Sequence, residues 1–365
     1  MQLNTDKSNY MIIGSIKVTN KMRKSLISYN IKLSGQTIKE SDTEKYLGDY
    51  IHQLGNDQSI VTTVKRRYGK AMEAIIDIKN IIEDVRAETV GAIDSGLQIF
   101  ELSVIPYILY NSETWDNIPK EAMQLLEKIQ LTFLRILLKT PKTTPILSLL
   151  WETGSMNIKG KIMMRKLNLY HHIMNLEEDE IARKVAMIQI NNKFPGLMNE
   201  CQDLLKKFNL DDIDVNECTK FAWKKNVKKA VTNDYIKDML NKMKKYKKLD
   251  TEIKREETFE TKKYLKEMNL SRARMKFSME SQMVKHFKFN YMSDLKNERS
   301  NWACNYCLEK EKKYQPDSMK HALNCPEYSS IRLEYNLDEQ EDAVDFFTKI
   351  VTLRNSLYHE SVANK

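Results

Sequence analysis

The feature that most constrains the fold is a long apolar stripe in residues 60–85. Apolar side chains recur there at steps of three or four residues, the period of one face of an α-helix. Only 10 Gly and 7 Pro occur among 365 residues, so few positions interrupt such a helix. Similar stripes predict helices at residues 90–104, interrupted at Pro106, at residues 126–136 between Pro119 and Pro141, and at residues 162–173.

The first 55 residues carry a different pattern, which predicts short β-strands. Residues 10–13 form a short apolar run that ends at Gly14, and apolar residues alternate with polar ones from Tyr29 to Leu33. A few strands of this size cannot form a stable domain by themselves. We therefore expect a mainly α fold with a small N-terminal β-rich part, the tail end of a larger sheet.

Positive charge is concentrated in one segment, from Thr219 to Tyr291. This segment contains 21 Lys and Arg against 9 Asp and Glu, a net charge of +12, whereas the whole chain has a net charge of +9. Aromatic residues lie among the lysines, as in Phe221-Ala222-Trp223-Lys224-Lys225. The segment indicates a surface that binds phosphates. The alternative is a set of solvated, lysine-rich helix faces without a ligand, with the aromatic residues in the core.

Three of the five cysteines lie near one histidine towards the C-terminus. Two residues separate Cys304 from Cys307, and His321 and Cys325 follow after a gap of thirteen residues. Two close pairs joined by a loop supply the four ligands of a tetrahedral Zn²⁺ site. Because His321 and Cys325 are four residues apart, we expect both to lie on one face of a helix. The alternative is three free thiols and an incidental histidine.

The cysteine count and the N-terminal sequence bear on location. An odd number of cysteines, without an apolar signal core in the first residues, argues against a secreted disulfide framework. The most apolar run, Ile129 to Leu138, is broken by Arg135 and is too short to cross a bilayer. We expect an intracellular protein, nuclear or cytoplasmic, that is not secreted and has no membrane partner.

Several stretches, in this order along most of the chain, carry a resemblance to a known family. They are residues 3–11, Tyr46-Leu47-Gly48, Asn111-Ser112-Glu113-Thr114-Trp115, residues 141–154 and the Cys-His group with residues 326–332. Together they resemble the C-terminal portion of LINE-type (non-LTR) retrotransposon reverse transcriptases. In that family the corresponding features are a lysine-containing palm segment, the primer-grip turn, an N-x-E-x-W stretch, a P-x-x-T-P … E-x-G signature and a C-terminal zinc segment.

The resemblance implies five segments. Residues 1–55 would be the remnant of the reverse-transcriptase palm, and residues 56–175 a helical, thumb-like domain. Residues 176–295, which match the family less well, would be a basic helical C-terminal region. A CCHC zinc module at residues 296–335 and a C-terminal helix or tail at residues 336–365 would follow.

The carboxylates that such a polymerase needs are absent from this sequence. The family holds two Mg²⁺ ions with an aspartate on an early palm strand and a pair in a Tyr-x-Asp-Asp hairpin. No Tyr-x-Asp-Asp occurs here, and Leu210-Asp211-Asp212 lies in a polar setting that does not suit a buried hairpin. We assign no catalytic residue and expect this chain alone to be inactive. Mg²⁺ would bind only in a full-length enzyme that includes the missing palm and fingers.

The segments that remain without the catalytic carboxylates are ones that bind ligands. The resemblance implies that their partner is RNA and DNA in the form of a template–primer duplex. Arginine and lysine contacts to phosphates position a duplex without reading its sequence. A structural Zn²⁺ would be held by Cys304, Cys307, His321 and Cys325. The residues predicted to contact nucleic acid are Lys7, Tyr46, Leu47, Gly48, Arg66, Arg67, Lys70, Lys224, Lys225, Lys228, Arg272 and Arg274.

Three hypotheses follow from these patterns. The first is a truncated reverse transcriptase that retains its affinity for nucleic acid. The second is a domesticated RNA- or DNA-binding zinc protein built from the same parts and without an enzymatic role. The third is a helical interaction protein in which the zinc site is purely structural.

Overall fold

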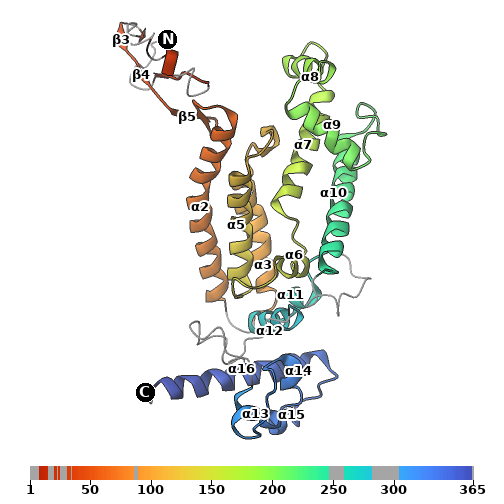
Figure 1. Cartoon of the computed structure of the whole chain (residues 1–365). Helices are drawn as coiled ribbons and strands as arrows, with labels where there is room; N and C mark the ends of the chain where they lie inside the picture. Colours follow the sequence, from red (N-terminus) through yellow and green to blue (C-terminus); the bar gives the residue numbers. More distant parts are fainter. Residues whose placement is uncertain are drawn as a thin grey trace. The chain divides into compact units, whose positions relative to one another are not determined.

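The computed structural model describes residues 8–14, 20–22, 24, 31–33, 35–85, 89–245, 259–281 and 304–363. The fold is mainly helical with small N-terminal sheets, as the sequence predicted (Figure 1). The chain divides into two compact units. The first unit contains Met1–Ile78, Ile99–Phe133 and Met156–Asn241, and the second contains Lys79–Gln98, Leu134–Ser155 and Lys242–Lys365. Each unit therefore contains residues from several of the five segments expected from the sequence.

The described residues of the N-terminal part form three small two-stranded sheets. Strand β1 (Asn9–Tyr10) pairs in parallel with β4 (Lys39–Glu40), and β2 (Lys32–Leu33) pairs antiparallel with β3 (Gln36–Thr37). The third sheet is an antiparallel hairpin of β5 (Thr43–Tyr46) and β6 (Asp49–His52).

The strand expected at residues 10–13 is shorter than predicted. After Tyr10 the backbone leaves the ladder, although Ile12 remains buried and the Gly14 N–H donates to the Gln53 carbonyl at 2.8 Å. The apolar run therefore reflects burial of a side chain and does not mark a continuous strand. Of the alternating run at residues 29–33, β2 contains Lys32 and Leu33, and Tyr29 lies outside the described residues.

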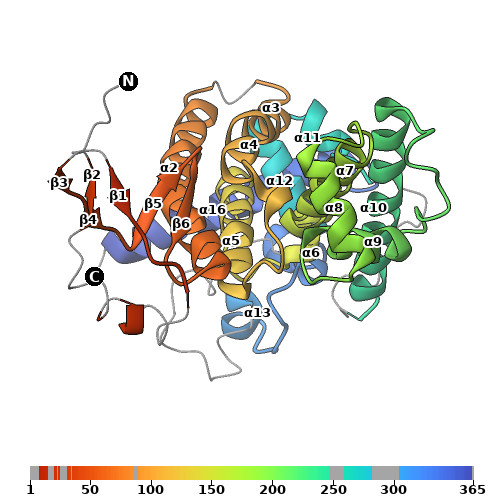
Figure 2. The same ribbon diagram turned by 90° about the horizontal axis from the view of Figure 1, so that it is seen from above.

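The β5–β6 hairpin is fixed to the start of the first long helix, α2 (Asn56–Asp84). The Tyr50 N–H donates to the Thr63 hydroxyl and the His52 N–H to the Ser59 hydroxyl, both at 2.9 Å. Figure 2 shows the two strands beside this end of α2. The hydroxyls satisfy backbone donors on the free edge of β6, so the hairpin has a defined position on the helix.

Helix α2 buries the stripe that the sequence predicted. Ile60, Val64, Ala71, Ile75, Ile78 and Ile82 are all buried. Tyr68, which lies four residues after Val64 and so at an expected position of this stripe, is only half-buried, and Arg67 is buried in its place. The physical reason is the helical period, because Arg67 lies three residues after Val64 and four before Ala71.

The second predicted helix is not ended by Pro106. It consists of α3 (Ala92–Ile99), a π-helical segment η2 (Phe100–Val104) and α4 (Ile105–Ile108), with Pro106 in the first turn of α4. Proline has no N–H to donate to the preceding turn, and the π segment lies where the regular ladder changes. Within the first unit, Phe100 stacks on Phe133 of α5 (Lys120–Leu137), with ring centroids 4.0 Å apart.

Helices α7 to α10 complete the first unit. Their bounds are α7 (Ile158–Met174), α8 (Ile181–Asn191), α9 (Leu197–Lys207) and α10 (Lys220–Met243). Helix α7 contains the predicted helix at residues 162–173. Trp223 of α10 is 1% exposed, and its indole N–H donates to the Leu167 carbonyl at 3.0 Å. Trp223 therefore packs in the core, as the alternative interpretation of the basic segment predicts for its aromatic residues, and Phe277 is buried as well.

The second unit contains shorter helices and the C-terminal helix α16 (Gln340–Ala363). Phe346, Phe347 and Ile350 of α16 form one buried cluster with the three clustered cysteines. The segment with the clustered cysteines and the C-terminal helix thus share a core. No helix among the described residues is both long and apolar enough to cross a membrane. The remaining helices and turns are η3 (Ser112–Thr114), α6 (Ile146–Glu152), α11 (Lys263–Glu267), α12 (Leu270–Glu280), α13 (Asn305–Glu309), α14 (Met319–Ala322), η5 (Pro326–Tyr328) and α15 (Ser329–Arg332).

Candidate metal centre and basic helix face

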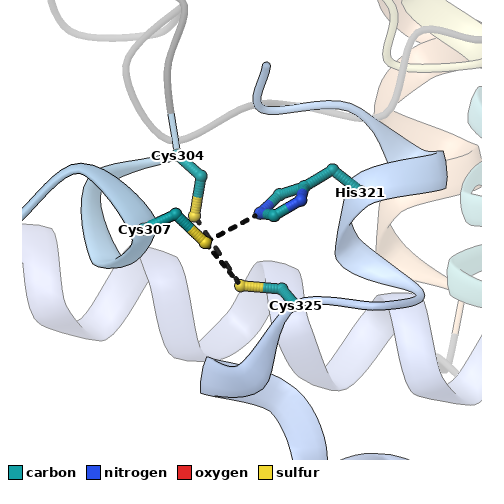
Figure 3. Close-up of side chains that lie close together, drawn as sticks. All are labelled: Cys304, Cys307, His321 and Cys325. Atoms are coloured by element: carbon teal, nitrogen blue, oxygen red, sulfur yellow. Dashed lines mark hydrogen bonds between the residues drawn. The ribbon is translucent and has the colours of Figure 1, made fainter. Parts of the chain in front are cut away.

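The four predicted metal ligands converge on one point. Their Sγ and Nε2 atoms all lie within 4.8 Å of one another, and Figure 3 shows the four side chains pointing toward a common centre. The Sγ atom of Cys325 lies 3.8 Å from those of Cys304 and Cys307, and the Cys307 Sγ lies 3.4 Å from the His321 Nε2. This arrangement is placed to bind a metal ion.

The donor set and its spacing fit a tetrahedral ion. With metal–sulfur bonds of about 2.3 Å, a tetrahedral site has sulfur–sulfur edges of about 3.8 Å. The two sulfur–sulfur distances to Cys325 have this value. Among the described residues, this is the one group of three or more His, Cys, Asp or Glu side chains close enough to share an ion.

The local backbone presents the ligands in a way that differs from the sequence prediction. His321 lies in the short helix α14, which ends at Ala322, whereas Cys325 has an extended conformation and precedes the turn η5. The two residues therefore do not share one helical face. A turn brings them together, in which the Asn324 N–H donates to the His321 carbonyl at 2.9 Å.

Hydrogen bonds hold the ligand-bearing loops in place. The Cys304 N–H donates to the Gln315 carbonyl at 2.8 Å, and the Lys313 N–H donates to the Cys307 carbonyl at 2.9 Å. The Arg332 guanidinium donates to the Cys325 carbonyl at 2.6 Å. These contacts orient the loops on both sides of the site.

A buried ion pair links the centre to α16. Arg354 and Asp317 are both less than 10% exposed, and their nearest charged atoms are 2.9 Å apart. Arg354 also donates to the Tyr328 hydroxyl at 2.9 Å. Although burial opposes its charge, Asp317 and Tyr328 raise the pKa of Arg354. The pair therefore places a fixed arginine from α16 against the segment that carries His321 and Cys325.

Burial of the four side chains favours the neutral forms of three of them. Burial raises the pKa of the Cys307 thiol, raises that of Cys325 to about 12, and lowers that of the His321 imidazole. A neutral imidazole is ready to coordinate, whereas the thiols must release protons when a metal binds.

A second polar cluster, the Arg67 cluster, joins three stretches of the first unit. The Arg67 guanidinium donates to the Gly48 carbonyl at 3.0 Å and to the Tyr110 carbonyl at 2.7 Å, and it pairs with the Asp49 carboxylate. The Asn111 amide donates to the same carboxylate. Burial lowers the pKa of Arg67, and Asp49 opposes this shift. The cluster connects the hairpin turn, α2 and the Asn111 segment.

The Tyr46-Leu47-Gly48 stretch forms the tip of the β5–β6 hairpin. Leu47 has a φ of 47° and Gly48 a φ of 92°, as a type I′ turn requires. A side chain at Gly48 would also approach the Tyr110 ring to 3.0 Å. Tyr46 and Leu47 are 63% and 74% exposed. The turn therefore presents two apolar side chains to solvent, while its backbone is tied to Arg67.

The cations predicted to bind phosphates separate into two groups. Arg66 and Lys70 of α2 are exposed, and so are Lys224, Lys225 and Lys228 of α10. Arg67, Arg272 and Arg274 are instead held within the chain, and Lys7 lies outside the described residues. The prediction that Arg67 contacts a phosphate does not fit its position, because its guanidinium is buried and bonded to four acceptor groups.

The two arginines of α12 are occupied by neighbours in the second unit. Arg272 pairs with Glu341 at 3.3 Å and with Asp345 at 3.1 Å. The Arg274 Nε donates to the Leu137 carbonyl at 2.9 Å. Burial lowers the pKa of Arg274. Both side chains therefore contribute to internal packing in this structure.

The exposed lysines of α10 form the basic face of this helix, defined as Lys220, Lys224, Lys225, Lys228 and Lys229. All five are exposed, whereas Trp223, Val227 and Val231 face the core. No described residue forms an ion pair with any of the five lysines, and residues 220–230 contain no acidic residue. Phe221, in the same turns, is 81% exposed.

Asp49 and Lys229 belong to these sites but were not singled out from the sequence, and Asn111 was noted there only as part of the Asn111–Trp115 stretch. Lys229 continues the lysine run and could have been included on spacing alone. The sequence around Asp49 gives no comparable signal, because the role of Asp49 depends on its contact with Arg67, eighteen residues further along the chain.

Comparison of the chain with protein-family models, with curated proteins and with solved structures gives no match.

Proposed function

We propose that the chain binds the sugar–phosphate backbone of nucleic acid through the basic face of α10. The observation that carries this proposal is the row of five exposed lysines, without described ion-pair partners, beside an exposed aromatic ring. Unpaired lysines on a stable helix can replace the counterions of a polyanion, and each replacement adds affinity. Phe221 adds a surface on which an unpaired base can stack.

The dimensions of the face suit a nucleic-acid strand. From Lys220 to Lys229 the helix rises by about 14 Å. Over this length the lysines can contact several phosphates of one strand. Such contacts position the strand but do not read its base sequence. The binding is therefore expected to depend on charge and shape, without strong sequence preference.

We further propose that the chain is a non-catalytic portion of a LINE-type reverse transcriptase. The order of the family-like stretches along the sequence supports this placement. A second support is that two of these stretches meet in the Arg67 cluster, through the Gly48 carbonyl and the Asn111 side chain. The aspartates of polymerisation would belong to a longer element, and we expect no primer extension by the purified chain with Mg²⁺.

We assign the metal at the Cys-His centre as Zn²⁺, with a structural role. Three thiolates and an imidazole are a typical closed zinc set, and the ligands leave no open position for a substrate. The bound ion would cross-link the loops that pack against α16. Native mass spectrometry is expected to find one zinc per chain. Cys325→Ser should lose the ion, whereas Cys218→Ser, a thiol outside the centre, should retain it.

The nucleic-acid proposal is tested by the salt dependence of binding. An RNA–DNA hybrid is titrated with the full chain at several salt concentrations, and log K is plotted against log salt. We expect a steep negative slope, reduced by about two in a Lys224→Gln/Lys228→Gln variant. A matched variant with the same charge change, Lys310→Gln/Lys320→Gln in the metal-bearing segment, should keep the wild-type slope. A flat wild-type plot would eliminate nucleic-acid binding.

The two alternatives make different predictions. A helical interaction protein with a structural zinc site would show the flat plot. A domesticated nucleic-acid-binding protein would show the steep one, but the genomic DNA upstream of the coding sequence would contain no in-frame Tyr-x-Asp-Asp. An in-frame motif there would support the reverse-transcriptase placement.

A further inference from the structure

A pocket of about 450 Å³ lies within the second unit. Its lining comes from the C-terminal ends of α2 and α5, from one face of α12 and from α16. The lining contains no residue of the metal centre or of the basic face of α10. Half of the lining residues are apolar, namely Val85, Leu138, Leu270, Met275 and Val351. The pocket therefore offers an apolar surface that the sites described above do not use.

Arg274 of α12 supplies a cation to this pocket. Its Nε donates to the Leu137 carbonyl at 2.9 Å. No described residue accepts a hydrogen bond from its two terminal nitrogens, and no described carboxylate forms an ion pair with it. These nitrogens are also not among the enclosed polar atoms of the chain, so a ligand can reach them. A guanidinium with free terminal N–H groups can donate two parallel hydrogen bonds to a carboxylate.

The charges in the lining match a ligand with one negative charge. Arg274 and Lys139 are basic and Glu83 is acidic, so the lining has a net charge of 2 − 1 = +1. Glu83 already pairs with Lys79 of the same helix, at 3.2 Å. Burial lowers the pKa of Arg274, and Glu83 opposes this shift. The guanidinium is thus partly desolvated without a bonded counter-charge, which an anion in the pocket would provide.

We propose that this pocket binds a small organic monoanion, a carboxylate carried on an apolar chain. The terminal nitrogens of Arg274 donate to the carboxylate, and the exposed Lys139 adds charge beside it. The chain of the ligand lies against the apolar walls, among them Leu270 and Val351. This site does not rest on the proposed nucleic-acid function.

The lining favours such a ligand over phosphate or a nucleotide. A phosphate dianion would exceed the net charge of the lining and would leave the apolar walls without a contact. The sugar and base of a nucleotide need several polar partners, whereas the lining offers only Ser271 and Ser278 besides its charged groups. The volume lies within the range of small-molecule sites, about 300–1,000 Å³.

Isothermal titration of the full chain with octanoate, octanol and acetate tests the head and the chain of the ligand separately. We expect octanoate to bind about tenfold more tightly than octanol, because only the carboxylate pairs with Arg274. Octanoate should bind at least about tenfold more tightly than acetate, which has no chain to bury. Equal affinity for octanoate and octanol, or no binding of octanoate, would overturn the proposal.

Two arginines of α12 give a matched pair of variants. Arg274→Met should weaken octanoate about tenfold and leave octanol unchanged. Arg272 lies two residues earlier, is bonded to Glu341 and Asp345, and does not line the pocket. Arg272→Met should therefore keep the wild-type affinity for octanoate. An equal loss of octanoate affinity in both variants would contradict the assignment of the head group to Arg274.

Arg274→Met also removes the hydrogen bond to the Leu137 carbonyl, so circular dichroism checks its fold and two further variants act without that loss. Ser278→Phe places a ring in the pocket and should weaken octanoate and octanol alike. Lys139→Gln, at an exposed position, should weaken octanoate alone, and by less than Arg274→Met. Octanoate affinity that neither variant changes would place its binding elsewhere and overturn the pocket. Loss of the pocket in these tests would leave the salt-dependent binding of nucleic acid by α10 as a separate question.

Discussion

Helices α2 and α10 both carry basic residues, but they use them in opposite ways. In α2 the most enclosed cation, Arg67, faces inward and fixes the β5–β6 hairpin through the Asp49 carboxylate and the Gly48 carbonyl. In α10 five lysines face outward, and the inward positions are apolar or aromatic. The difference shows that helical phase, more than the number of charges, decides whether a cation stabilises the fold or remains available to a ligand.

The chemistry of the two side chains agrees with this division. A guanidinium offers five donors in a fixed plane, and Arg67 uses them on several acceptors at once. A lysine ammonium is a strongly hydrated point charge on a flexible stem, which suits an exposed contact with phosphates. The same division holds in α12, where Arg272 and Arg274 are bonded within the second unit.

The largest effect is expected from Arg67→Met. This change removes the guanidinium and leaves the Asp49 carboxylate largely enclosed without its main partner, which should lower the free energy of unfolding by about 3 kcal/mol. Urea titration followed by circular dichroism measures the change. Arg66→Met, at the exposed neighbouring position, should alter it by less than about 0.5 kcal/mol. Equal effects of the two substitutions would show that the comparison between inward and outward cations is wrong.

Substitution of exposed cations should have a smaller effect, which is confined to nucleic-acid binding. Lys225→Gln/Lys229→Gln on α10 should reduce the slope of log K against log salt by about two for an RNA–DNA hybrid. Arg66→Gln/Lys70→Gln on α2 should reduce it by less than about one, because α2 presents a shorter row of cations and the Arg66 guanidinium lies over the Tyr50 ring. The opposite order would move the interface from α10 to α2.

Much of the fold could be predicted because apolar periodicity reports burial directly. The stripes predicted α2, α5 and α7, and core positions for the aromatic residues of the basic segment, such as Trp223, were predicted as the alternative to a ligand surface. The prediction that Pro106 interrupts the second helix was wrong, because the helix continues past Pro106 through a π-helical segment. The strand at residues 10–13 was too long, because burial of Ile12 needs no ladder.

The candidate sites were predictable to different extents. Cys304, Cys307, His321 and Cys325 are soft ligands at short spacing, so their convergence could be inferred from the sequence, although the turn that joins the last two could not. The Arg67 cluster depends on contacts between residues 18 to 62 positions apart, such as Arg67 with Asp49 and Asn111 with Asp49. A single sequence carries no record of such contacts.

The smallest effect sharpens the comparison most directly, because it contrasts an arginine and a lysine that were both predicted to bind nucleic acid. Arg272 pairs with Glu341 and Asp345 near the surface of the second unit, with about 29% of its side chain exposed. Partly exposed ion pairs contribute little, so Arg272→Gln should lower the free energy of unfolding by at most about 1 kcal/mol.

The same variant should leave affinity for the hybrid unchanged, because the guanidinium is already neutralised by two carboxylates. Lys225→Gln should show the reverse pattern, with unchanged stability and weaker binding. Urea titration and anisotropy on both variants measure the two properties separately. If Arg272→Gln weakened binding as much as Lys225→Gln, the carboxylates would have to release Arg272 when the hybrid binds, and an ion pair within the free chain would no longer mark a cation as unavailable.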